Sequence, residues 1–149
     1  MNVLIDSNVI LDALLRRGEF AENAARILAL SEKGLIDGYV SASAVTDIYY
    51  IISKTIKNKS SALALLKKLL SVIHVASVTD NIIREAVALE WNDFEDCIQY
   101  VVGKGVFSKY IITRNPKDFS EGSVEVISPD QFIEFIESSA VHESEDASC

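Results

Sequence analysis

Residues 3–15 read VLIDSNVILDALL, and this stretch decides the fold. Its first three residues are aliphatic and partly β-branched, which is typical of a short buried strand over residues 3–5. Asp6 ends that run, and the apolar segment after it predicts a buried helix over residues 8–17, stopped by Gly18. A buried strand followed at once by a buried helix is how a βαβ unit begins, so the stretch favours an α/β protein.

The remainder of the chain repeats this alternation of short strands and longer helices. Further strands are predicted over residues 38–41, 72–76, 110–113 and 124–127, and helices over about 19–33, 43–54, 60–70, 79–89, 92–104 and 129–137. Such alternation favours a parallel sheet with helices on both faces. We therefore expect a three-layer α/β/α fold around a central four- to five-stranded parallel sheet.

Length and composition indicate one folded domain. The chain has 149 residues, of which 49% are apolar, so a wholly disordered chain is excluded. No apolar run approaches the roughly 20 residues of a membrane-spanning helix, and the first residues lack the basic region of a signal peptide. Cys97 and Cys149 form no disulfide framework, which favours a reducing, cytoplasmic setting. We assign residues 1–138 to the domain and residues 139–149 to an acidic, mobile C-terminal tail.

The net charge of −8 argues against a nucleic-acid-binding protein until its distribution is considered. Residues 1–117 hold 14 basic and 13 acidic residues, whereas residues 118–149 hold nine acidic residues and no Lys or Arg. Five lysines occur with no acid between them: Lys54, Lys57, Lys59, Lys67 and Lys68. They are either the solvated faces of two helices or a patch that contacts phosphates beside an active site.

Several acidic residues come from distant points of the chain to one end of the predicted sheet. Ligands of open α/β sheets bind outside the carboxyl ends of the strands. The acidic residues expected there are Asp6, Asp47, Asp93, Asp96 and Asp118, and the polar residues Thr113, Arg114 and Asn115 follow the fourth strand. Carboxylates packed together raise one another's pKa values, and a divalent cation removes that cost. Hard oxygen ligands of this kind suit Mg²⁺ or Mn²⁺.

Each of these acids also has a purely structural interpretation. Asp6 is a favoured residue type for a helix N-cap, although the end of a buried strand is a costly place for a mere cap. Asp93 and Asp96 have the spacing of a capping box. Asp47 has the pattern of an ordinary surface acid, and Asp118 that of a turn residue.

Asp12 is the one acid of the first helix, and it lies four residues before Arg16. This spacing predicts an ion pair on the surface of the helix rather than a site residue.

Four segments resemble the PIN-domain family (PilT N-terminus-like) in the family's order. They are VLIDSNVILDALL (3–15), SASAVTDIYYII (41–52), DFEDCIQYV (93–101) and YIITRNPKDF (110–119). The last two resemble the subgroup of VapC-type toxin ribonucleases of prokaryotic toxin–antitoxin pairs. The resemblance implies a PIN-like fold, an acidic site and cleavage of RNA that depends on Mg²⁺ or Mn²⁺.

The resemblance also implies roles for individual residues. Asp6, Asp47 and Asp96 correspond to metal ligands, and Asp47 stands where the family usually has Glu. The fourth acid of the family commonly follows the Thr-Arg pair directly, but this position is Asn115 here, so Asp118 is expected to supply the carboxylate. The expected catalytic set is thus Asp6, Asp47, Asp96 and Asp118. The expected substrate-binding set is Ser7, Asn8, Asp93, Thr113, Arg114 and Asn115.

The sequence therefore predicts a metal-dependent endoribonuclease with RNA as its substrate. The resemblance further implies a toxin with an antitoxin partner, and a homodimer formed through the early helices. One alternative is a PIN-like module without catalysis that binds RNA or a protein, which the departures at Asp47 and Asn115 keep open. A haloacid-dehalogenase-type phosphatase is a weaker alternative, because Asn8 stands where that class needs a second Asp.

Overall fold

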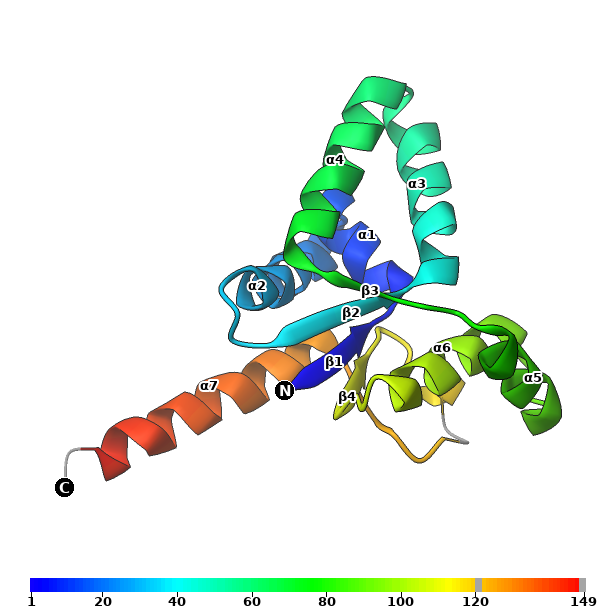
Figure 1. The fold of residues 1–149 in the computed structure, drawn as a ribbon. Coiled ribbons are helices and arrows are strands. Elements are labelled where there is room, and N and C mark those ends of the chain that lie inside the picture. Colours follow the sequence, from blue (N-terminus) through cyan, green and yellow to red (C-terminus); the bar gives the residue numbers. More distant parts are fainter. Residues whose placement is uncertain (120–121, 148–149) are drawn as a thin grey trace.

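A five-stranded, all-parallel sheet forms the centre of the computed structural model, which describes residues 1–119 and 122–147 (Figure 1). The strands are β1 (Asn2–Ile5), β2 (Asp37–Ser41), β3 (His74–Ala76), β4 (Tyr110–Ile112) and β5 (Glu125–Ile127), in the spatial order β3-β2-β1-β4-β5. β1 is central and pairs with β2 on one side and with β4 on the other. The predicted parallel sheet is confirmed, with five strands.

The helices follow the strands in the alternating order that the sequence predicts. They are α1 (Ser7–Leu15), α2 (Ala21–Glu32), α3 (Ala42–Ile56), α4 (Lys59–Val72), α5 (Asp80–Leu89), α6 (Phe94–Gly105) and α7 (Pro129–Asp146), with 3₁₀ turns η1 (Gly18–Phe20) and η2 (Pro116–Phe119). No helix in the described part of the chain is long and apolar enough to cross a membrane.

The two faces of the sheet are covered by different helices. Val3 and Ile5 pack on one face with residues of α1, α2, α3, α4 and α7, while Leu4 packs on the other face with residues of α5 and α6. Side chains alternate between the faces along a strand, so continuous apolar strands with helices on both sides are expected of a parallel sheet. The expected three-layer architecture is therefore confirmed.

Helices α3 and α4 form a hairpin that stands away from the sheet (Figure 1). Asn58 caps the start of α4, since its side chain accepts a hydrogen bond of 3.0 Å from the Ser61 backbone N–H. The hairpin begins at the carboxyl end of β2, and this position brings the first turns of α3 to the edge of the sheet where a site is expected.

The end of the last helix differs from the prediction. α7 continues to Asp146 instead of ending near residue 137, and it thus runs through most of the segment assigned to the tail. No Gly or Pro interrupts residues 130–147. The hydroxyls of Ser138 and Ser139 donate to the carbonyls of Glu134 and Phe135, respectively, so these serines follow the helix rather than end it. The helix end placed near residue 137 was wrong, whereas the mobility of residues 139–147 stays a prediction.

Of the two cysteines, Cys97 lies among the described residues and Cys149 does not. Cys97 is buried in α6, where its Sγ donates to the Ala86 carbonyl at 3.5 Å. Cys149 lies outside the described residues, so the predicted lack of a disulfide stays a prediction.

Candidate active site

An open cleft of about 490 Å³ lies at the carboxyl ends of the central strands. Among the described residues, no Lys, Arg or His lines it, and its lining includes six carboxylates: Asp6, Asp47, Asp93, Glu95, Asp96 and Asp118. Ser7, Asn8, Tyr50, Ile51 and Gln99 complete the lining. The structure thus brings together all five acids that the sequence places at this end of the sheet.

Asp6 is the most buried acid of the cleft, with 6% of its surface exposed. Its Oδ2 accepts a hydrogen bond of 2.7 Å from the hydroxyl of Thr113, which follows the neighbouring strand β4, and Ser7 Oγ donates to Oδ1 at 3.4 Å. Although Asp6 is the N-cap residue of α1, its side chain makes no capping hydrogen bond. The capping interpretation of Asp6 is therefore wrong, and its carboxylate is oriented by Thr113 instead.

The start of α6 supplies three of the acids. Asp93 caps this helix, because its Oδ1 accepts from the Asp96 backbone N–H at 2.9 Å. Burial, followed by repulsion from Asp93, Asp6, Asp118 and Glu95, raises the pKa of Asp96 from 3.8 to about 7. Burial, followed by repulsion from Asp47, Asp93 and Asp6, raises the pKa of Glu95 as well. These shifts show that the acids of the cleft act on one another electrostatically.

Two exposed acids complete the cleft from opposite sides. Asp47 projects from the second turn of α3, and Asp118 lies in the turn η2 after β4. Asp118 is near enough to contribute to the raised pKa of Asp96. The cleft therefore collects carboxylates from the end of β1, from α3, from α6 and from η2.

Three of the expected substrate-binding residues do not line the cleft. Thr113 is buried behind Asp6, and its hydroxyl also accepts a bond of 3.2 Å from the Asn115 backbone N–H. Arg114 turns away to Asp12, with Nε 3.0 Å from Oδ2. A direct contact of Thr113, Arg114 or Asn115 with substrate stays a prediction.

The predicted role of Asp12 was wrong. Asp12 is fully buried, and its partners are Arg114 and, at 3.8 Å, Arg17 rather than Arg16. Arg16 is the C-cap of α1 with a left-handed backbone (φ 53°), so the helix ends before the expected i,i+4 pair is complete. Burial raises the pKa of Asp12 even though Arg114 and Arg17 lower it.

Glu95, Gln99 and Tyr50 line the cleft but were missed in the sequence. Gln99 is almost fully buried and lies one turn after Asp96 and Glu95, so helical spacing was a signal that could have found it. Tyr50 lies one turn after Asp47 by the same rule. Glu95 offered no separate signal, because an acid in the first turn of a helix is common for electrostatic reasons alone.

The donor chemistry of the cleft fits a divalent cation. Carboxylate oxygens are the ligands that Mg²⁺ and Mn²⁺ take. The raised pKa of Asp96 reflects burial first and then repulsion from the neighbouring acids, and a cation would relieve this repulsion. In the described part of the chain, no group of three His, Cys, Asp or Glu side chains stands close enough to form a ready metal site.

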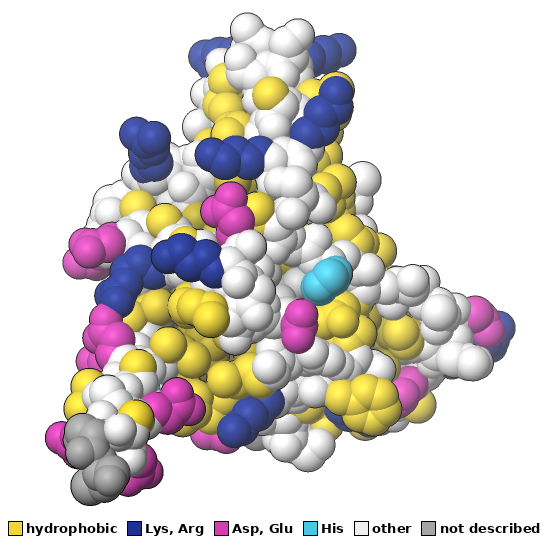
Figure 2. Space-filling model, turned by 60° about the vertical axis from the view of Figure 1, so that its left-hand side comes forward, with side chains coloured by type: hydrophobic (Ala, Val, Ile, Leu, Met, Phe, Trp, Pro, Cys, Tyr) yellow, Lys and Arg dark blue, Asp and Glu magenta, His cyan; other side chains and the backbone are white. Residues whose placement is uncertain are grey.

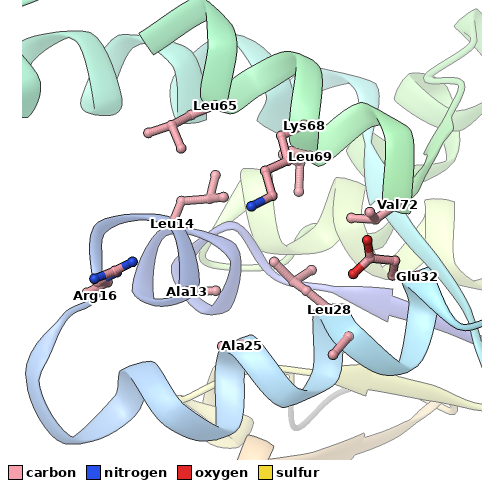
Figure 3. A pocket seen from close by; sticks show the side chains of 11 residues that line it. Ala13, Leu14, Arg16, Ala25, Leu28, Glu32, Leu65, Lys68, Leu69 and Val72 are labelled. Carbon is pink, nitrogen blue, oxygen red and sulfur yellow. The ribbon is translucent and has the colours of Figure 1, made fainter. Parts of the chain in front are cut away.

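A separate groove of about 250 Å³ lies between α1, α2 and α4. Figure 3 shows apolar side chains, among them Leu14, Leu28, Leu65 and Leu69, in the space between these helices. Charged groups of Arg16, Glu32 and Lys68 also line it. It shares no lining residue with the acidic cleft.

The parallel sheet and the acidic cleft at its carboxyl end define a class of α/β proteins, and comparison with known families names that class. A family model described as "PIN domain" matches residues 2–117. The chain belongs to the PIN-domain family, which confirms the resemblance of the four sequence segments.

Individual relatives and solved structures are similar to this chain over most of its length. The chain is 29% identical to Ribonuclease VapC1 of Aquifex aeolicus over 140 residues, which cover 89% of this chain and 93% of the relative. A chain in the structure of VapBC2 from Rickettsia felis, bound to a promoter DNA fragment, has a TM-score of 0.67 at 17% identity, covering 86% of this chain and 98% of that chain. VapC20 of Mycobacterium tuberculosis, described as a toxin that cleaves the sarcin–ricin loop, has a TM-score of 0.66 at 15% identity, covering 83% and 98%, respectively.

Proposed function

We propose that the protein is a metal-dependent endoribonuclease. The observation that carries the proposal is the cleft at the carboxyl ends of the strands of a PIN domain, where the described part of the chain contributes six carboxylates and no basic side chain. Similarity to Ribonuclease VapC1 supports RNA as the substrate. A metal-free cleft of this charge repels a phosphodiester, so the carboxylates suit the substrate only when a cation lies between them.

Asp6, Asp47 and Asp96 would hold Mg²⁺ or Mn²⁺, and Asp118 would complete the acidic set. A divalent cation bound there lowers the pKa of a water molecule and stabilises the charge that develops on the phosphate. Thr113 fixes the rotation of the Asp6 carboxylate through its bond to Oδ2, which leaves Oδ1 beside Ser7. Ser7 and Asn8 begin α1, where unpaired backbone N–H groups and the helix dipole favour an anion such as the scissile phosphate.

The remaining residues of the predicted set act at a distance from the phosphate. Asp93 holds the start of α6 in place and thereby fixes Asp96. Arg114 is engaged by Asp12, and Asn115 forms the turn that leads to Asp118, whose N–H donates to the Asn115 carbonyl at 3.1 Å. In our proposal these residues position the acids rather than bind RNA.

The test is cleavage of a mixed RNA pool by the purified protein in Mn²⁺ and in EDTA. Asp6→Asn and Asp96→Asn variants are purified identically, and Mn²⁺ binding is measured for all three proteins by calorimetry. We expect cleavage that requires the metal and is absent in both variants, together with weaker Mn²⁺ binding in each. Asp80→Asn serves as a matched control, because Asp80 lies in α5 outside the cleft and pairs with Arg84 at the surface.

Other results would count against the proposal. Cleavage that survives EDTA or both substitutions would indicate a contaminant or a different site. If the wild-type protein shows no cleavage and binds no Mn²⁺, the result would favour the PIN-like module without catalysis.

We further propose that the protein is the toxin of a toxin–antitoxin pair and forms a homodimer. The solved structures of similar fold include a toxin–antitoxin complex from Klebsiella pneumoniae. The apolar groove between α1, α2 and α4 supports a protein partner on a surface separate from the cleft. Induced expression in a bacterial host should arrest growth, and Asp6→Asn should abolish the arrest. Light scattering of the purified protein should give twice the chain mass, and a monomer would contradict the dimer.

A further inference from the structure

A second hollow adjoins the acidic cleft along the α3–α4 hairpin. It has a volume of about 420 Å³ and is lined by Tyr50, Ser53, Lys54, Lys57, Asn58 and Lys59. Tyr50 lines the cleft as well, so the two hollows meet at this ring. A path from the six carboxylates to the three lysines therefore runs past Tyr50.

The path follows one face of α3. Asp47, Tyr50 and Lys54 are spaced three and four residues apart, and residues at this spacing lie one above the other on a helix. From Asp47 to Lys54 the helix rises by about 10 Å. The lysines thus lie two turns away from the acids, towards the tip of the hairpin.

The charge along this path changes sign. Lys54 lies over the Tyr50 ring, with Nζ 5.8 Å from the centroid, and within the described residues Lys54, Lys57 and Lys59 have no carboxylate partner. Figure 2 shows Lys and Arg side chains around the hairpin at the top of the view, while the Asp and Glu side chains of that face lie lower. Unpaired ammonium groups of this kind attract a polyanion.

Lys57 adopts a backbone conformation that ordinarily favours glycine. It is the C-cap of α3, with φ 57° and ψ 30°. A side chain in this left-handed region costs roughly 1 kcal/mol relative to Gly, so the lysine is not the residue that the turn itself prefers. The same fact makes Lys57→Gly a substitution that removes the charge without harming the turn.

We propose that an unpaired RNA strand leaves the cleft across Tyr50, with a base stacked on its ring and the neighbouring phosphates on Lys54, Lys57 and Lys59. This inference rests on the proposed ribonuclease function and adds where the substrate is held outside the catalytic acids. Tyr50 is 63% exposed, so its ring is available to a base. Stacking on an exposed aromatic ring needs an unpaired base, and stacking combined with a basic groove is how proteins hold single strands without sequence preference.

The test measures binding of a fluorescein-labelled, single-stranded RNA of mixed sequence by anisotropy. All proteins carry Asp6→Asn and are assayed with Mg²⁺, so that bound RNA stays intact. The test variant combines Lys54→Gln, Lys57→Gly and Lys59→Gln. The control combines Lys33→Gln, Lys67→Gln and Lys109→Gln, which removes the same charge from exposed positions outside the second hollow.

The salt dependence of binding separates a contact from general attraction. Each phosphate contact to a single strand contributes about 0.7 to the slope of log affinity against log salt, so losing three contacts should reduce the slope by about 2. The control should keep the slope of the Asp6→Asn protein. An equal change in both triple variants would mean long-range attraction without a defined path and would overturn the inference. Unchanged RNA binding in the test variant would overturn it too and would point to an acidic protein surface as the partner of these lysines.

The Tyr50 ring is tested separately, with a substitution that keeps the ring. Tyr50→Ala should weaken RNA binding about 5- to 150-fold, as expected for the loss of one base stack, whereas Tyr50→Phe should bind nearly as well as the parent. Equal binding by Tyr50→Ala and Tyr50→Phe would overturn the stacking. Thermal melts of all variants should agree closely, and Lys57→Gly alone should keep or raise the melting temperature.

Failure of this inference can be told from failure of the proposed function. If the wild-type protein cleaves RNA with metal while the lysine and Tyr50 substitutions leave RNA binding unchanged, the result supports the ribonuclease function and contradicts the RNA path across Tyr50. If the wild-type protein neither cleaves nor binds RNA, the proposed ribonuclease function and the RNA path are both contradicted.

Discussion

Asp12 ties the segment after β4 to the first helix. Its buried carboxylate receives Arg114, whose guanidinium also lies over the Phe20 ring with Cζ 4.4 Å from the centroid. Arg114 directly follows Thr113, which holds Asp6. The pair thus lies one residue behind the contact that orients the most buried acid of the cleft, and a buried carboxylate depends strongly on its partner.

Loss of Arg114 should destabilise the protein. Arg114→Ala leaves Asp12 buried with only the more distant Arg17, and we expect the free energy of unfolding to fall by roughly 3 kcal/mol. Arg16→Ala is the matched control, and it should change the free energy of unfolding by less than about 0.5 kcal/mol because Arg16 is exposed. Urea denaturation measures both. If both variants lose the same free energy of unfolding, the result would favour the Asp12–Arg16 ion pair that the sequence predicts.

Thr113 should matter for metal binding through Asp6. Thr113→Val removes the 2.7 Å bond to Oδ2 while keeping the shape of the side chain, and we expect Mn²⁺ affinity to fall about 10-fold, as for other partners of metal ligands. Thr113→Ser keeps the hydroxyl and should restore most of the affinity. Calorimetric titration with Mn²⁺ gives the comparison, and equal affinity of the Val variant and the wild-type protein would show that Thr113 does not orient Asp6.

Sequence patterns located the acids of the cleft but not their partners. Asp6, Asp47, Asp96 and Asp118 fall at strand ends or helix starts, where a parallel sheet converges. The contacts of Arg114 and Thr113 depend on how the segment after β4 crosses α1, and no local spacing encodes a contact between residues about a hundred positions apart.

At the level of elements, strands were predicted better than helix ends. Short aliphatic runs bounded by polar residues are strong strand signals, and all five strands were found. Val72 was placed in the predicted strand over residues 72–76, yet it is the last residue of α4, and the strand begins at His74. The end of α7 was misplaced because its final turns carry no apolar stripe.

Those final turns of α7 should contribute little to stability. Residues 139–147 are nearly all exposed, with Val141 56% exposed. A chain that ends after Ser138 should therefore melt within about 2 °C of the full chain and cleave RNA at the same rate. Differential scanning calorimetry measures the first and the RNA-pool assay the second. A substantially lower melting temperature would place residues 139–149 within the folded domain.

For the whole molecule, the acidic cleft implies a conflict between function and stability. Asp96 and Glu95 have pKa values raised in the folded protein, so the folded state binds their protons at a higher pH than the unfolded chain does. Their contribution to stability therefore grows as pH falls through the folded pKa, which is about 7 for Asp96.

Metal-free protein in EDTA should accordingly melt a few degrees higher at about pH 6 than at about pH 8. Asp96→Asn should remove most of this dependence and, at pH 8, raise the melting temperature by about 2 to 4 °C, equivalent to about 1 kcal/mol. Mn²⁺ should raise the melting temperature of the wild-type protein at pH 8 but barely that of Asp96→Asn. A melting temperature of the wild-type protein that falls on acidification from pH 8 to pH 6 would contradict the proposed repulsion.

The borders of the sheet bear on how the protein behaves at high concentration. The two outermost strands, β3 and β5, have three residues each. Outer strands this short expose few unpaired amide and carbonyl groups with which another chain could form hydrogen bonds. Short outer strands are one way in which proteins avoid aggregation and fibril formation. Concentrated solutions of the native protein should thus resist amyloid-like assembly.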